Sequence, residues 1–177
     1  SITATGPVTT GNLSTSFGQI TVASSGGPVS TGTITPGWYA TITADGTITP
    51  GAIYAGGGEV NLVSANGAVT AQAITGYYHV VVTAKNDINT GIITSTNNEI
   101  TITSSDGKAT TEDLTGYYHV YVTAKNDVTL GEVRSTNNEV HLKSETGDIV
   151  TEDPINAYFE VKIEAPEGKV TVDSVES

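Results

Sequence analysis

The chain has 177 residues, and its 19 acidic and 7 basic side chains give a formal net charge of -12 at pH 7. This charge argues against nucleic acid or an anionic membrane surface as a partner, and no apolar run is long enough to span a membrane. The chain has no Cys, which excludes disulfides and thiolate metal sites. Because it also has no Met, we expect a processed product or an excised fragment; removal of a signal peptide would make Ser1 the mature end.

Short alternating segments follow one another along the chain, each preceded by a Gly or Asn turn. The turns recur after 21 or 19 residues, at Gly6, Gly27, Gly46, Gly67, Asn86, Gly107, Asn126, Gly147 and Gly168. Apolar-x-apolar pairs recur with them, at Ile20/Val22, Ala40/Ile42, Val60/Leu62, Val80/Val82, Ile100/Ile102, Val120/Val122, Val140/Leu142 and Val161/Ile163. Two residues beyond each pair stands Ser or Ala. A period of two indicates short β-strands and excludes a helical pattern.

Self-similarity at about 20 residues is the signature of a solenoid. One such unit cannot bury its apolar face alone, but stacked units bury continuous columns of Val, Ile and Leu. The sequence therefore predicts an all-β, single-domain β-solenoid (β-helix) over residues 1–177. We expect nine coils of about 20 residues, stacked at about 4.8 Å into a rod of about 43 Å.

Charge divides the solenoid into two halves. Residues 1–84 carry two charged side chains, Asp45 and Glu59, whereas residues 85–177 carry the other 24. Because the weakly charged coils obey the same repeat, we expect them to be folded. A solvated surface usually mixes charges throughout, so their lack of charge indicates a surface that is covered by another molecule.

Aromatic residues recur in every second coil, two residues before the apolar-x-apolar pair. The expected ridge comprises Trp38, Tyr39, Tyr77, Tyr78, Tyr117, Tyr118, Tyr158 and Phe159, and Gly or Asn occupies the coils between. Large rings need small neighbours above and below, which explains why the strongest repeat is 40 residues. Simple corner packing is the favoured interpretation. Stacking on sugar rings and interdigitation with another subunit remain as functional alternatives, the second preferred.

Glu and His alternate in the next column, at Glu59, His79, Glu99, His119 and Glu139. The favoured interpretation is a surface ladder of charge-assisted hydrogen bonds, each worth little. Zinc binding is an alternative because both residue types are zinc ligands, but the two His are expected two coils apart. A pH-sensitive interface is the other alternative.

An acidic set follows the apolar positions of the later coils: Glu112, Asp113, Glu152 and Asp153, with Asp106 and Asp148. Carboxylates bind Ca²⁺, but the Gly- and Asp-rich nonapeptide calcium repeat is absent, so a solvated face is favoured. No nucleophile-elbow, zincin, P-loop or dinucleotide motif is present, and the even coil spacing leaves no long loop to carry an active site. We therefore expect no enzyme activity and no cofactor.

A turn followed by Gly or Asp and then by Val or Ile recurs along the chain, as in "TGDIVTED" from Thr146 and "KNDVTLGEV" from Lys125. This pattern resembles bacterial surface β-solenoids. These are the adhesin head domains and the filamentous haemagglutinin-type repeats. A weaker resemblance is to sheath, surface-layer and filament subunits. Both imply a secreted protein at the cell surface. We expect a self-assembling structural subunit of a filament, sheath or surface layer, with copies of itself as partner. The alternative is an adhesin head that binds a cell-surface glycan.

Overall fold

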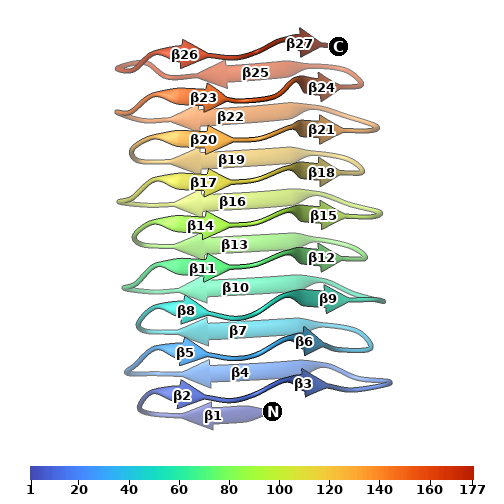
Figure 1. The fold of residues 1–177 in the computed structure, drawn as a ribbon, viewed down its shortest axis with the longest axis vertical. Coiled ribbons are helices and arrows are strands. Elements are labelled where there is room, and N and C mark those ends of the chain that lie inside the picture. Colours follow the sequence, from blue (N-terminus) through green and yellow to red (C-terminus); the bar gives the residue numbers. More distant parts are fainter.

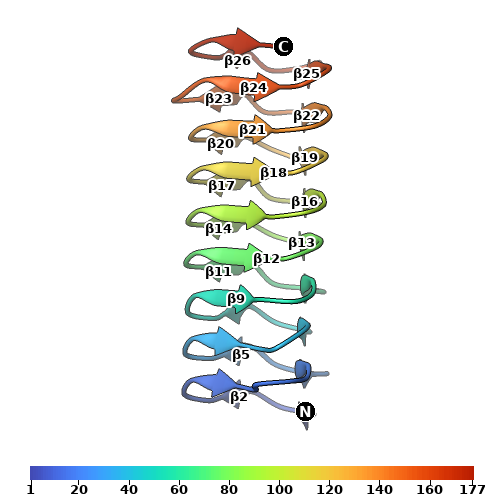
Figure 2. The same cartoon turned by 90° about the vertical axis from the view of Figure 1, so that its right-hand side faces the viewer.

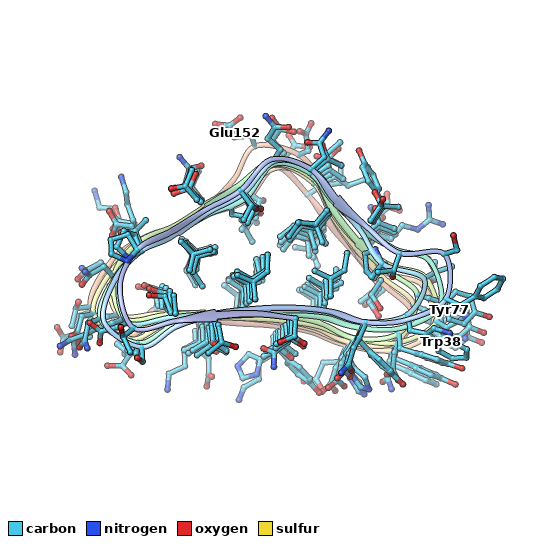
Figure 3. All side chains as sticks on the ribbon, turned by 90° about the horizontal axis from the view of Figure 1, so that it is seen from below. Trp38, Tyr77 and Glu152 are labelled. Atoms are coloured by element: carbon cyan, nitrogen blue, oxygen red, sulfur yellow. The ribbon has the colours of Figure 1, made fainter.

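The computed structural model describes all residues 1–177, and it confirms the predicted all-β solenoid. Its 27 short strands form three parallel sheets of nine strands each, and consecutive coils of the chain lie side by side in every sheet (Figure 1). Each coil contributes one strand to each sheet in turn. The chain winds as a right-handed helix, the usual hand for parallel crossovers (Figures 1 and 3).

Sheet A contains the longest strands, and the other two sheets contain strands of two or three residues. Sheet A comprises β1 (Ile2–Ala4), β4 (Ile20–Ser24), β7 (Ala40–Ala44), β10 (Val60–Ser64), β13 (Val80–Ala84), β16 (Ile100–Ser104), β19 (Val120–Ala124), β22 (Val140–Ser144) and β25 (Val161–Glu164). Sheet B comprises β2 (Val8–Thr9), β5 (Val29–Ser30), β8 (Ile48–Thr49), β11 (Val69–Ala71), β14 (Ile88–Thr90), β17 (Ala109–Thr111), β20 (Val128–Leu130), β23 (Ile149–Thr151) and β26 (Val170–Thr171). Sheet C comprises β3 (Leu13–Ser14), β6 (Ile34–Thr35), β9 (Ile53–Ala55), β12 (Ile74–Gly76), β15 (Ile93–Ser95), β18 (Leu114–Gly116), β21 (Val133–Ser135), β24 (Ile155–Ala157) and β27 (Val175–Glu176).

The three sheets enclose a triangular interior, which is filled by stacked columns of apolar side chains (Figure 3). A single cluster of 35 buried residues forms this core. Ile102, for example, is fully buried and pairs with Val82 and Val122 in the adjacent coils. The alternating pattern fixes which face is buried, because successive side chains of a strand point to opposite sides of the sheet.

The 40-residue repeat arises from an exchange of one residue between two corners. We call the corners AB, BC and CA after the sheets that they join. The AB turn alternates between four residues, as in 105–108, and three, as in 85–87. The CA corner compensates, with three residues in 117–119 and four in 96–99. Sheet A therefore advances 20 residues per coil through the middle of the rod, while sheet B alternates between 19 and 21.

The predicted column of small residues marks the AB corner, and the longer turns use Ser there. The hydroxyl groups of Ser24, Ser64, Ser104 and Ser144 each donate a hydrogen bond of 2.7–2.8 Å to a backbone carbonyl of the preceding coil's turn. In three of these coils the hydroxyl also accepts the N–H of the Gly three residues later. The shorter turns have Ala at this position, at Ala44, Ala84 and Ala124, so the choice between Ser and Ala follows the turn length.

The rod is regular along its whole length. Seen from the side, the coils stack directly above one another, and no connection leaves the stack as a long loop (Figure 2). The weakly charged residues 1–84 form the first four coils and the strand β13, and they share one continuous core with the acidic coils. This part of the chain is folded, as the repeat predicts.

Candidate functional site

The expected aromatic ridge lies along the CA corner, where Trp38 and Tyr77 project outward (Figure 3). Its rings form one pair in each of four alternate coils. The ring centroids of Trp38 and Tyr39 are 6.4 Å apart, and the three later pairs are edge-to-face at 4.8–4.9 Å. The ridge residues remain 37–66% exposed. The largest apolar side chains of the chain are thus presented to solvent at a fixed interval.

The coils between the ring pairs contain small or short residues, as the sequence predicts. A Cβ atom on Gly58 would lie 2.6 Å from the carbonyl oxygen of Trp38 and 2.8 Å from Cδ1 of Tyr39. The next two intervening coils have Asn98 and Asn138 at this corner. The ridge is therefore a row of projecting rings separated by gaps, with a spacing of about 10 Å for two coils.

The shorter corner of each Tyr-Tyr coil depends on Gly at the end of the sheet C strand. A Cβ atom on Gly116 would lie 2.8 Å from the carbonyl oxygen of His119 and 2.9 Å from Cγ2 of Val120. The longer corners have Ser there, and the hydroxyl groups of Ser95 and Ser135 donate to the carbonyl groups of the Tyr residues one coil before. The shorter corner therefore has no room for a side chain at this position.

Two further rings are exposed, one at this corner and one outside it. Phe17 is 92% exposed at the CA corner of the first coil, and Tyr54 is exposed on the outer face of β9. Phe17 lies one residue before Gly18, and Gly18 is the residue of the first coil that corresponds to Trp38 and Tyr78 in later coils. Its place at the same turn is the signal that sequence reasoning missed.

The Glu/His column lies beside the ridge, and its pairs run in one direction. His79 Nδ1 is 3.4 Å from Glu99 Oε1, and His119 Nδ1 is 3.6 Å from Glu139 Oε1, so each His faces the carboxylate of the next coil. Glu59 has no ion-pair partner. All of these side chains are partly exposed, so each pair contributes little to stability.

Neighbouring Asn residues fix the orientation of the two His rings. Asn98 Nδ2 is 3.1 Å from His79 Nε2, and Asn138 Nδ2 is 3.1 Å from His119 Nε2. An amide NH₂ group only donates, so each Nε2 accepts and the ring proton of the neutral imidazole is on Nδ1. In His79 that proton faces the Glu99 carboxylate.

Tyr121 extends the second of these networks. His119 Nδ1 donates to the Tyr121 hydroxyl at 2.9 Å, and this hydroxyl donates to Glu139 Oε1 at 2.8 Å. The two rings are stacked, with centroids 5.1 Å apart. Burial, then the hydrogen bond and charge of Glu139, raise the pKa of Tyr121 to about 12. The hydroxyl therefore stays protonated over the physiological range.

A third His pair was not predicted from the sequence. His141 Nε2 donates to Glu164 Oε2 at 2.8 Å, and Lys162 Nζ is 3.1 Å from the other carboxylate oxygen. These hydrogen bonds, that of His141 first, hold the pKa of Glu164 below its usual value. His141 lies on the outer face of sheet A one coil after Tyr121. Following the Tyr121 column for one more coil would have revealed it.

The acidic set is divided between two corners. Glu112, Asp113, Glu152 and Asp153 lie at the BC corner, beside a groove of about 520 Å³ (Figure 3, Glu152). Asp113 Oδ1 accepts the backbone N–H of Glu132 at 3.0 Å. Asp106 and Asp148 lie at the AB corner, where Asp148 Oδ1 accepts the N–H of Lys169 at 2.8 Å. The structure has no group of three or more His, Asp or Glu side chains placed to hold a metal ion.

No helix of sufficient length and apolar character to cross a membrane is present. No protein-family model, curated protein or solved structure matches the chain.

Proposed function

We propose that this chain is a structural subunit of an extracellular filament, sheath or surface layer that assembles from copies of itself. The observation that supports this most is the distribution of the exposed rings. A site for one small ligand gathers its apolar groups in a concave pocket, whereas these rings follow one corner from Trp38 to Phe159 at a constant interval. Exposed apolar surface of this extent is typical of an interaction surface.

The outer face of sheet A gives further support. In the weakly charged half its outward side chains are Thr, Asn, Val and Ala, half-buried in β4, β7, β10 and β13 and exposed at Thr3 in β1. A flat face without charge can pack against another subunit without the cost of burying unpaired charge. The extracellular location is inferred from the resemblance to bacterial surface solenoids.

The second candidate function is an adhesin head that binds a glycan. It is favoured by the polar groups beside the rings, since the Asn98 and Asn138 amides and the neighbouring carboxylates can hydrogen-bond to sugar hydroxyl groups. A stable monomer that binds glycans would support this candidate in place of assembly.

The experiment that tests the assembly proposal is sedimentation of purified protein over a range of concentrations, together with Lys variants of sheet A. Thr21→Lys and Thr41→Lys place charge on the uncharged face, and Thr101→Lys is the matched change in the acidic half. All three residues are half-buried and point outward. We expect the first two to weaken assembly while the monomer stays folded, and the third to do less. Assembly that is unchanged by the first two would contradict the proposal.

A further inference from the structure

The ridge has the form of alternating projections and gaps. Number the coils from 1 to 9 along the chain. Coils 2, 4, 6 and 8 present ring pairs, and coils 3, 5 and 7 present Gly57–Gly58, Asn97–Asn98 and Asn137–Asn138. A ligand that fills these gaps must repeat every two coils, at about 10 Å. A second copy of this chain has the same coils and therefore the same repeat.

We propose that two copies pair along this ridge in an antiparallel arrangement, with the rings of each copy lying in the gaps of the other. This proposal rests on the proposed function and specifies its elementary contact. Most closed homodimers have a two-fold axis. A two-fold axis parallel to the rods sets each coil against the same coil of the partner, so that rings meet rings. A two-fold axis perpendicular to the rods reverses one copy, and an axis that lies midway between coils 4 and 5 sets every even coil against an odd one.

This register uses every ring pair. Coil 4 faces coil 5 of the partner, coil 6 faces coil 3, and coil 2 faces coil 7, so all three gaps are filled. The fourth pair, in coil 8, faces coil 1, where Phe17 is the most exposed large apolar side chain of the chain. The interface thus covers the one ring that the core leaves almost entirely in solvent.

Charge favours the same arrangement. Residues 1–84 have two acidic and no basic side chains, a net charge of -2, and residues 85–177 have 17 acidic and 7 basic side chains, a net charge of -10. The two sum to the -12 of the whole chain. Antiparallel pairing sets the acidic half of each copy against the weakly charged half of the other. Parallel pairing would set two acidic halves side by side, at a cost in repulsion.

The Glu/His column also matches across the pair. A two-fold axis perpendicular to both the rods and the line between them leaves the two A sheets on the same side of the dimer, so the two columns meet. Because Glu lies in odd coils and His in even coils, His79 faces Glu99 of the partner subunit, and His119 faces Glu59 of the partner subunit. Glu59, which has no ion pair within its own chain, would thereby gain a cationic or hydrogen-bonding partner.

The test combines ring variants with cross-linking in the full chain. Tyr77→Ser with Tyr117→Ser removes one ring from each of two ring pairs, and Tyr54→Ser is the matched change on the outer face of sheet C. Buried Tyr side chains are frequent hot spots, so we expect the double variant to raise the dimer dissociation constant at least about a hundredfold. We expect the control to leave this constant unchanged and all variants to keep the native β-sheet circular dichroism spectrum.

Single Cys residues report the orientation, because the natural chain has none. Asn97→Cys in coil 5 lies about one coil from its mate in the antiparallel pair, whereas Phe17→Cys in coil 1 lies about 34 Å away along the rod. A short bismaleimide should link the first variant and not the second. Equal linking of both variants, or a dissociation constant unmoved by the ring variants, would overturn the proposal. Filaments that persist in that case would leave the proposed function standing, whereas a native protein that stays monomeric at millimolar concentration would overturn both.

Discussion

Replacement of Ile102 by Asp tests the register of the whole solenoid. Ile102 is fully buried between Val82 and Val122, in the sixth of nine coils. The substitution loses about 1.5–3 kcal/mol of side-chain burial. It also leaves an unpaired carboxylate in the core, which costs several kcal/mol more. The sum is comparable with the about 5–15 kcal/mol that stabilises a typical domain, so we expect the central coils to unfold.

The effect should be local as well as large, because each coil of a solenoid contacts only its neighbours. Hydrogen exchange should show lost protection in β13, β16 and β19, and circular dichroism should show a lower melting temperature. The control is Thr101→Asp, one residue away and pointing outward, for which we expect a change of about 0.5 kcal/mol or less. If both variants melt at the native temperature, the inward and outward faces of sheet A have been assigned the wrong way round.

Three further changes test the corners and the polar network. Ser104→Ala removes the hydroxyl that bridges two turns, so we expect a loss of about 1–3 kcal/mol in the free energy of unfolding. The control Ser105→Ala, on the exposed turn, should change this free energy little. Equal losses in the two variants would show that the Ser104 hydroxyl does not stabilise the corner. Gly116→Ala forces a Cβ atom against backbone at the Tyr-Tyr corner, so its melting temperature should fall, and an unchanged value would contradict the stated role of Gly. The pKa of Tyr121 is raised on folding to about 12, so its contribution to stability is present below its unfolded value of about 10 and is lost as pH rises through 12. Absorbance titration should show that one Tyr, Tyr121, ionises at higher pH than the others. Glu139→Gln should lower the pKa of Tyr121 in the same titration.

Much of the fold follows directly from the sequence. The strict two-residue alternation and the Gly and Asn turns determine which side chains are buried, because a one-residue shift would expose every apolar side chain of sheet A. The number of coils then follows from counting. What the period did not reveal was the compensation between the AB and CA corners. The sequence shows turns that alternate between 19 and 21 residues and apolar pairs that recur every 20, but the strand bounds are needed to place the compensating residue at the CA corner.

The candidate site was less completely predicted. The ridge and the Glu/His column follow from position in the repeat. The hydrogen-bond partner of each side chain cannot be predicted from its position in the repeat, because hydrogen bonds depend on the direction in which a side chain leaves the coil. His79 pairs with Glu99 above it and leaves Glu59 below it unpaired, although the sequence places both at equal distance. Tyr121 and His141 project from the neighbouring column, and only the folded sheet brings them to the carboxylates.

Electron microscopy of the purified native protein, imaged over a range of concentrations, tests the central claim most directly. Self-assembly through the ridge and the uncharged face of sheet A predicts filaments or sheets built from rods of about 43 Å, with neighbouring rods side by side. Isolated single rods at every concentration would contradict the assembly proposal.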